Sequence, residues 1–314
     1  MTTTFTLRIG TRKSPLATWQ AEYVASQLQS HGFSVELVPI TTSGDVLQGS
    51  LAQAGGAGLF TKEIQRALLD NRCDIAVHSL KDLPTEPIEG LGLAAVPMRE
   101  DPSDCLVARE ARSLETLPPG AVVGTGSPRR RAQLAQRRPD LTLSDIRGNV
   151  DTRLKKLSSG EFDAIVLALA GLRRLGLEHS VSETLSLDTM LPAVGQGALG
   201  LETRVDDARS IDAVRTLDHA ASHMAVHCER EVLRQLRAGC LAPVAAHARW
   251  VDDEFTMSCR VYSRTLDRCV TAHHAVGSQN PRATDPGLTE SMIGEIMRQL
   301  IAQDAIQIVS DSRT

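Results

Sequence analysis

The sequence predicts an α/β protein made of two similar lobes, followed by a smaller α+β domain. Strand-like and helix-like segments alternate over the first two thirds of the chain, which is typical of mostly parallel sheets with helices on both faces. A Gly-Thr and Ser-Pro pattern occurs at Gly10–Pro15 and again at Gly124–Pro128, each time between a strand and a helix. Beyond Gly197, alternating segments indicate antiparallel strands.

The first lobe has the order strand, helix, strand, helix, strand. Ser14 and Pro15 suit the N-cap and first position of a helix, and Gly32 suits its end. A glycine-rich stretch, 44–58, precedes the second helix. The expected elements are strands at 5–10, 35–40 and 74–77 and helices at 15–30 and about 61–71.

The second lobe repeats this order after the break at Asp101-Pro102. Segment 199–202 is strand-like and is expected to return to the sheet of the first lobe. The elements expected in the second lobe are strands at 105–108, 121–124, 141–143 and 164–167, a helix beginning at Pro128 and a helix at 150–158.

The last third is expected to begin with two helices and to end with a third. The elements are helices at 206–217, 219–237 and about 288–302, with strands at 244–248, 255–262 and 269–275. The expected domains are therefore 1–98 together with 198–217, 99–197, and 218–314.

The composition of the chain argues against several classes of protein. The 314 residues include 42% apolar and 23% charged side chains, enough for packed cores. No apolar run is long enough to cross a bilayer, and the N-terminus lacks the pattern of a secretory signal, so we expect a cytoplasmic protein without a membrane partner.

The six cysteines form no C-x-x-C pair, which argues against a disulfide framework or zinc knuckle. A net charge of −4 and 3% aromatic residues argue against nucleic-acid binding.

Arginine is concentrated between residues 127 and 153, a segment that contains seven arginines and only three aspartates. Several lie near the first turn of a helix, where a cation opposes the helix dipole. A bound polyanion would explain the placement, since arginine binds carboxylate and phosphate in a bidentate manner; a solvated basic face is the alternative. The cationic residues are Arg129, Arg130, Arg131, Arg147, Arg153, Arg173 and Arg174, with Arg12 and Lys13 in the first lobe.

Three further features could carry chemistry, and two of them also have a structural interpretation. Asp82 follows an apolar strand, where ligands bind in open α/β sheets, and its carboxylate can move a proton or stabilise a cation; otherwise it caps a turn before Pro84 and Lys81 is solvated. Cys240 lies in a Gly/Pro loop and can take a covalent attachment. The histidines recur every fourth residue, which suits a metal or, as we favour, a half-buried helix face. They are His219, His223 and His227.

Together these segments resemble the porphobilinogen deaminase family. The resemblance rests on collinear motifs between residues 7 and 243. They are Leu-Arg-Ile-Gly-Thr-Arg-Lys-Ser-Pro-Leu-Ala at 7–17, Asp-Ile-Ala-Val-His-Ser-Leu-Lys-Asp-Leu-Pro at 74–84, Val-Gly-Thr-Gly-Ser-Pro-Arg-Arg at 123–130, Arg-Gly-Asn-Val-Asp-Thr-Arg-Leu at 147–154, Ala-Gly-Leu-Arg-Arg-Leu-Gly at 170–176, 191–197, and Gly239-Cys240 with Pro243.

The resemblance implies two doubly wound lobes like those of periplasmic binding proteins and a third domain carrying the cysteine. It implies a dipyrromethane cofactor, joined to Cys240 by a thioether, on which four porphobilinogen molecules are added head-to-tail with release of ammonia. Hydrolysis then frees the linear tetrapyrrole hydroxymethylbilane, in tetrapyrrole and haem biosynthesis. We also expect a monomer, and no metal.

The resemblance also implies roles for single residues. Asp82 would stabilise the cationic ring left when ammonia departs and shuttle protons. The residues that would hold the cofactor and chain carboxylates are Lys81, Ser127, Arg129, Arg130 and Arg147. Those that would bind the incoming substrate are Arg12, Arg153 and Arg174.

The chain departs from the family pattern at three positions. Ala57 stands where a lysine is usual and Gln53 where a basic residue is common, so no role of that loop can be carried over. Ala238 replaces the first glycine before the cysteine. A non-catalytic two-lobed protein that binds polycarboxylates is the competing hypothesis, and it leaves the Cys240 loop unexplained.

Overall fold

The computed structural model describes residues 5–41, 61–239, 242–277 and 286–311. The chain divides into two compact units, Met1–Glu100 with Ala198–Met224, and Asp101–Gly197 with Ala225–Thr314. The three domain boundaries expected from the sequence stay a prediction. None of the described helices combines the length and the apolar character that crossing a membrane requires.

The first unit contains a five-stranded sheet in the order β2-β1-β3-β10-β4. Strands β2, β1 and β3 pair in parallel, whereas β10 pairs antiparallel with both β3 and β4. Thus β10 alone runs against the other four. The strands are β1 (Thr6–Thr11), β2 (Ser34–Pro39), β3 (Ile75–Ser79), β4 (Leu91–Ala95) and β10 (Leu199–Arg204).

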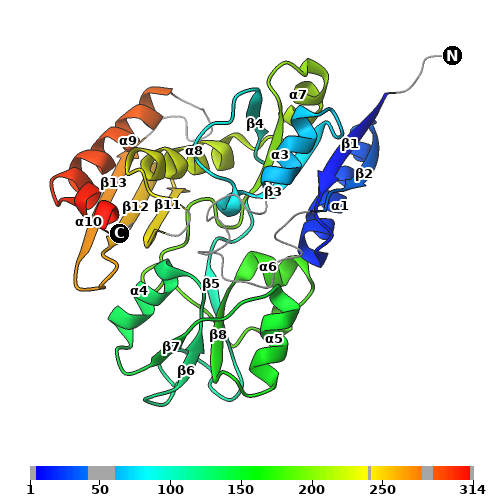
Figure 1. Ribbon diagram of the computed structural model, residues 1–314. Helices are drawn as coiled ribbons and strands as arrows, with labels where there is room; N and C mark the ends of the chain where they lie inside the picture. Colours follow the sequence, from blue (N-terminus) through cyan, green and yellow to red (C-terminus); the bar gives the residue numbers. More distant parts are fainter. Residues whose placement is uncertain (1–4, 42–60, 240–241, 278–285, 312–314) are drawn as a thin grey trace. The chain divides into compact units, whose positions relative to one another are not determined.

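Helices cover both faces of this sheet (Figure 1). Helices α1 (Pro15–Ser30) and α7 (Ala208–Arg215) share one apolar cluster with alternate residues of β1 and β3. Helix α3 (Lys62–Leu69) packs with residues of the opposite face. Ser14 caps α1 and Pro15 occupies its first turn, as the sequence predicts. This part of the fold is therefore doubly wound.

The second unit contains a five-stranded sheet with the same plan, β7-β6-β8-β5-β9. Strands β7, β6 and β8 are parallel, and β5 runs antiparallel to its neighbours β8 and β9. The strands are β5 (Asp104–Ala108), β6 (Val122–Gly124), β7 (Thr142–Ser144), β8 (Ala164–Ala168) and β9 (Glu183–Thr184).

This second sheet is also covered on both faces. Helix α4 (Pro128–Arg137) contributes Leu134 to one apolar cluster. Helices α5 (Val150–Ser158) and α6 (Leu169–Arg174) contribute Leu157 and Leu172 to the other. The two similar lobes predicted from the sequence are confirmed, and each opposed strand, β5 or β10, is the first strand after the chain passes from one unit to the other.

The prediction that 199–202 returns to the first sheet is confirmed by β10. The sequence analysis missed the edge strands β4 and β9, helix α6, and two short 3-10 helices, η1 (Leu80–Asp82) and η2 (Glu178–Ser180). Short edge strands carry few residues and therefore little periodicity to detect.

The C-terminal part of the second unit is a three-stranded antiparallel sheet, β11-β12-β13. Helices α9 and α10 pack against β12 and β13 (Figure 1). The small sheet domain predicted from the sequence is thus present. Its elements are β11 (Val244–Val251), β12 (Glu254–Tyr262), β13 (Cys269–Gly277), α9 (Pro286–Ile301), α10 (Ala305–Asp311) and the preceding α8 (Ala220–Gln235).

A buried polar network joins β3, β10 and α3 in the first unit. His78 Nε2 lies 2.9 Å from Glu202 Oε2, and Gln65 Nε2 donates to Glu202 Oε1 at 3.0 Å. All three side chains are buried. Glu202 belongs to the opposed strand β10. Its contact with His78 joins β10 to the parallel strand β3, which leads into residues 80–82.

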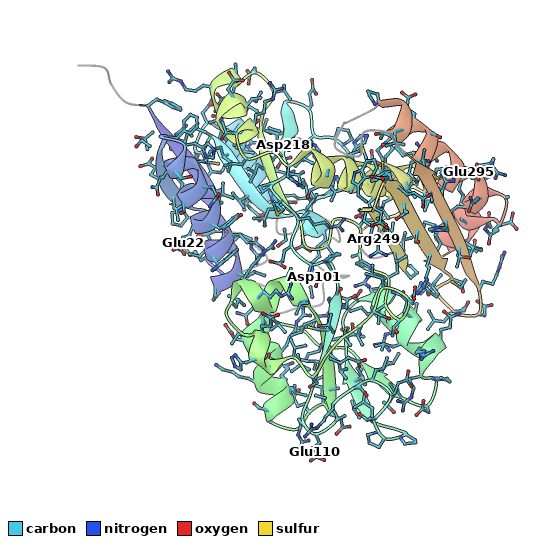
Figure 2. The ribbon with its side chains drawn as sticks, turned by 180° about the vertical axis from the view of Figure 1, so that it is seen from behind. Glu22, Asp101, Glu110, Asp218, Arg249 and Glu295 are labelled. Atoms are coloured by element: carbon cyan, nitrogen blue, oxygen red, sulfur yellow. The ribbon has the colours of Figure 1, made fainter. Side chains whose placement is uncertain are left out.

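We predict that Glu202→Ala lowers the free energy of unfolding by about 3 kcal/mol, since it leaves His78 and Gln65 buried without their common acceptor. Urea unfolding measures the change, and Glu202→Gln should lose less because it keeps one acceptor oxygen. Glu22→Ala, on the exposed side of α1 (Figure 2), is the matched control. Equal stabilities of Glu202→Ala and Glu22→Ala would contradict the prediction.

Candidate active site

The predicted anion-binding residues of the second unit follow the carboxyl ends of three parallel strands. Strands β6, β7 and β8 end at Gly124, Ser144 and Ala168 and lead directly towards α4, α5 and α6. Carboxyl ends of parallel strands meet at one edge of a sheet, the usual place for a ligand. The predicted residues that follow these ends are Ser127, Arg129, Arg130, Arg147, Arg153 and Arg174.

Two capped helix N-termini lie at this edge. The Ser127 side chain accepts a hydrogen bond from the Arg130 backbone N–H at 3.4 Å, and Asn149 Oδ1 accepts from Thr152 N at 2.9 Å. Unpaired N–H groups and the positive end of the dipole make such termini suitable for carboxylates.

The loops before α4 and α5 touch each other. A Cβ atom on Gly126 would lie 2.9 Å from the Ile146 carbonyl oxygen and 3.7 Å from Arg147 Cζ, so only glycine allows this approach. The Arg147 Nε donates to Asp145 Oδ2 at 2.9 Å, and both side chains are about half exposed. The contact brings Ser127 and Arg147, predicted from separate motifs, to neighbouring loops.

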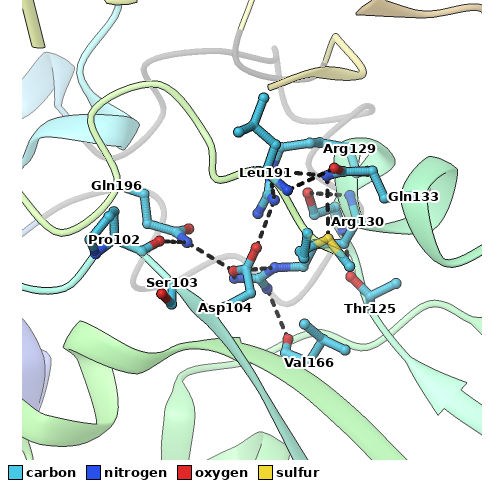
Figure 3. A network of polar contacts seen from close by, with 12 residues as sticks. Pro102, Ser103, Asp104, Thr125, Arg129, Arg130, Gln133, Val166, Leu191 and Gln196 are labelled. Carbon is cyan, nitrogen blue, oxygen red and sulfur yellow. Dashed lines mark hydrogen bonds and ion pairs between the residues drawn. The ribbon is translucent and has the colours of Figure 1, made fainter. Parts of the chain in front are cut away.

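Arg129 and Arg130 turn inward onto one carboxylate (Figure 3). Arg129 Nη1 lies 2.6 Å from Asp104 Oδ2, while Arg130 donates from Nε and Nη2 to Asp104 Oδ1 at 3.0 and 2.8 Å. Both arginines are buried and Asp104 is fully buried. Two cations against one anion leave this cluster with a net charge of +1.

Neutral groups complete the cluster. Arg129 Nη1 donates to the Leu191 carbonyl at 2.7 Å and Arg130 Nη1 to the Val166 carbonyl at 2.8 Å. Gln196 Nε2 donates to Asp104 Oδ1 at 2.9 Å and to the Pro102 carbonyl at 2.7 Å. The Arg129 Nε, although buried, has no hydrogen-bond partner within the described residues.

The ionisation of Asp104 follows from these contacts. Burial alone would raise the pKa of this carboxyl group, but Arg129 and Arg130 outweigh burial and hold the pKa far below its usual range. The carboxylate is therefore charged at any physiological pH, which is required to keep two guanidinium groups buried.

Two further predicted arginines contact backbone carbonyls. Arg153 Nε donates to Gly148 O at 2.8 Å, so it folds back onto the loop before α5. Arg174 Nη2, at the end of α6, donates to Gly197 O at 2.6 Å. These contacts orient both guanidinium groups at the edge formed by β7 and β8.

Arg12, Lys81 and Asp82 lie at one edge of the first unit's sheet. Arg12 follows β1 and η1 follows the adjacent parallel strand β3. Asp82 is exposed, and its side chain makes no hydrogen bond or ion pair with another residue in the part of the chain described.

The η1 turn itself is firmly held. Leu80 is buried, and its backbone N–H donates to Ala198 O at 3.0 Å. A Cβ on Gly200 would lie 2.8 Å from Leu80 Cδ1, so glycine in β10 makes room for this anchor. Before the turn, Ser79 Oγ accepts from Gln20 Nε2 of α1 at 2.8 Å. An exposed carboxylate thus extends from a firmly held backbone.

The sequence analysis missed Asp104 and Gln196 as parts of the site. A charged residue directly before the apolar strand 105–108 was the available signal for Asp104, whereas its arginine partners lie 25 and 26 residues away. Cys240, Gln53 and Ala57 lie outside the described residues.

The first two histidines of the predicted row have local partners. His219 Nδ1 lies 2.8 Å from Ser222 Oγ, and His223 Nδ1 lies 2.8 Å from Asp218 Oδ1. Within the described ranges, no group of three or more potential ligands is suited to a metal ion.

Comparisons with known proteins extend over most of the chain. Residues 7–212 match the family model described as "Porphobilinogen deaminase, dipyromethane cofactor binding domain", and residues 223–288 match "Porphobilinogen deaminase, C-terminal domain".

Solved structures with some similarity are bacterial binding proteins. A lipoprotein from Bacillus subtilis described as methionine-binding is 14% identical, with 68% of this chain and 89% of that chain covered and a TM-score of 0.43. A periplasmic substrate-binding protein of an ABC transporter from Coxiella burnetii is 15% identical, with 71% and 96% covered and a TM-score of 0.44.

We predict that Asp104→Asn lowers the free energy of unfolding by about 3–5 kcal/mol at neutral pH, because Arg129 and Arg130 lose their only buried counter-charge in the cluster. The exposed Asp145→Asn is the control. Urea unfolding of the two variants measures the difference, and a loss no larger than that of the control would contradict it.

The free energy of unfolding of Asp104→Asn should also depend on pH differently from that of the wild type. Because the folded pKa of Asp104 lies below its unfolded value of about 3.9, its stabilisation is complete above that value and is lost as pH falls towards the folded pKa. Stability of the Asn variant should therefore fall less steeply than that of the wild type as pH is lowered below about 4.

Proposed function

Because the chain belongs to the porphobilinogen deaminase family, we propose that Asp82, Cys240 and the arginines around α4 and α5 carry out that family's reaction. The chain is a transferase that joins four porphobilinogen molecules head-to-tail, releases ammonia, and forms the linear tetrapyrrole hydroxymethylbilane. Its cofactor is dipyrromethane. What is proposed below is the work of individual residues.

The residues at the edge of the second unit fit a polycarboxylate. Each pyrrole ring of the substrate carries an acetate and a propionate, so a two-ring cofactor brings four carboxylates. The Asp104 cluster keeps a net charge of +1, and the Arg129 Nε is a buried donor without a partner in the described residues. Two capped helix N-termini lie beside these groups.

We assign the cofactor to this set of donors. Ser127, Arg129, Arg130 and Arg147, with Lys81 from the first unit, would hold its carboxylates, and the Cys240 thiolate would attach it as a thioether. When bound, dipyrromethane supplies a primer that keeps the growing chain attached, so each coupling is effectively intramolecular.

Arg12, Arg153 and Arg174 are assigned to the carboxylates of incoming porphobilinogen. A guanidinium offers five N–H donors in a planar fork that matches a carboxylate. The backbone contacts of Arg153 and Arg174, together with their positions in α5 and α6, fix where these charges lie.

Asp82 is assigned to the reacting ring. When porphobilinogen loses ammonia the ring becomes a cation, and a carboxylate held near the pyrrole N–H group stabilises it and takes up the proton released on coupling. The observation that carries this assignment is an exposed carboxylate, without an internal partner in the described chain, on the buried anchor of Leu80. A binding protein without turnover has no need of such a group.

We further propose that the protein acts in the cytoplasm as a monomer and binds no nucleic acid. The family is cytoplasmic, and the net charge of −4 and the 3% of aromatic residues do not favour a nucleic-acid partner. Gel filtration of the purified protein tests the monomer.

Ammonia release tests the function itself. The purified protein, given porphobilinogen, should release one ammonia per ring consumed and yield a tetrapyrrole detectable by its absorbance after oxidation. Binding of porphobilinogen without ammonia would instead support the non-catalytic polycarboxylate-binding protein.

We predict that intact-mass spectrometry of the wild type shows an addition equal to two pyrrole units, and that Cys240→Ser loses it because a hydroxyl does not replace the thioether sulfur. Cys269→Ser, at a half-buried cysteine of β13, should keep the addition. An unmodified wild type with full activity would remove Cys240 from its assigned role.

We predict that Asp82→Asn lowers kcat by about 10²–10⁴-fold, the usual contribution of a proton-transferring group. Its thermal midpoint should stay within about 2 °C of the wild type, because the side chain is exposed. Glu86→Gln, an exposed change in the same loop, is the control for turnover. A near-normal kcat in Asp82→Asn would rule out the assignment.

A further inference from the structure

A cavity of about 420 Å³ opens between α4, the segment 186–190 and β12, all in the second unit. Its volume falls in the range of small-molecule sites. None of its lining residues is among those assigned above to cofactor or substrate. The lining side chains used below are Gln133, Gln136, Arg137, Asp188, Arg260 and Tyr262.

Arg260 of β12 is the central cation of this cavity. Its Nη1 donates to Gln133 Oε1 at 3.1 Å and its Nη2 donates to the Asp188 backbone carbonyl at 3.0 Å. Both acceptors are neutral. No carboxylate among the described residues lies within ion-pair distance of this half-buried guanidinium, in contrast to the Asp104 cluster. Its charge is oriented but not neutralised, a state that favours an anionic ligand.

The other lining groups add hydrogen bonding and define the rim. The Tyr262 hydroxyl donates to Gln136 Oε1 at 3.3 Å, and it also interacts with Arg260. Arg137 is paired with the Glu115 carboxylate at 2.8 Å and is exposed. The exposed carboxylate of Asp188 also borders the opening and repels negative charge that Arg260 does not compensate.

We propose that this cavity binds a small organic carboxylate, with one carboxylate group paired to the guanidinium of Arg260. A planar carboxylate carries one charge, which one guanidinium balances. A phosphate carries between one and two, and the surplus would meet Asp188. The assignment rests on this cavity alone and stands whether or not the residue roles proposed above are right.

Hydrogen bonds of Gln133 link the cavity to the Asp104 cluster. The Gln133 side chain accepts from Leu191 N at 2.8 Å and donates to Leu191 O at 3.0 Å. That same carbonyl accepts from Arg129 Nη1. A ligand on Arg260 therefore contacts a residue whose amide helps to position Arg129.

Calorimetric titration of the holoenzyme with propionate, which carries a single charge, tests the proposal. The wild type and Arg260→Gln are compared, so that only the binding lost with this guanidinium is assigned to the cavity. In the wild type, propionate should bind at this site with one site per chain. Arg260→Gln should weaken that binding about tenfold or more, as loss of a hydrogen bond to a charged group does. Arg249→Gln, an exposed arginine of β11 (Figure 2), should leave it unchanged.

Asp188→Asn keeps the test decisive even if Arg260→Gln fails to fold. This exposed change removes the negative charge at the rim, so it should strengthen propionate binding severalfold at low ionic strength. An affinity unchanged in both variants, or no propionate binding at millimolar concentration, would overturn the site. Inorganic phosphate binding as tightly as propionate would overturn its assignment to carboxylates.

Discussion

The single carboxylate of Asp104, held between two buried guanidinium groups, is the interaction on which the arrangement of the second unit depends. It fixes the first turn of α4 to the start of β5, although cations at a helix N-terminus oppose the dipole. Gln196 adds the segment that leads out of the unit, through Asp104 and Pro102. A neutral residue at 104 would leave two charges in a fully buried place, whereas one carboxylate makes their burial possible and still leaves a positive surplus.

The two sheets place chemistry at corresponding edges because they share one topology. In each, one parallel strand, β1 or β6, leads through a Gly-Thr pair into a helix capped by serine. The opposed strand performs a different task in each unit. Glycine in β10 lets Leu80 anchor the turn that carries Asp82, while β5 begins with the aspartate that binds Arg129 and Arg130. One unit thus presents an exposed carboxylate, and the other fixed cations.

The sequence predicted most elements because their signals are local. Ser-Pro at both helix starts and alternating apolar residues in β11 to β13 need no knowledge of distant partners. The roles of Arg129 and Arg130 depend on pairing that is spatial: Asp104 and Gln196 are 92 residues apart, yet their side chains are bonded. The motifs identified which arginines matter but not that two of them are buried, since a guanidinium in solvent and one on a carboxylate have the same sequence pattern.

Charge compensation distinguishes the guanidinium groups of this chain. Arg137 and Arg138 each have a carboxylate of their own, and the exposed pair of Arg137 contributes little to stability. Arg129 and Arg130 share one carboxylate, so part of their charge remains for a ligand. Among the described residues Arg260 is held by neutral oxygens, so its charge remains. Neutral acceptors orient a guanidinium without cancelling its charge, whereas a carboxylate cancels that charge. The degree of neutralisation, rather than the presence of arginine, therefore separates a structural cation from a receptor.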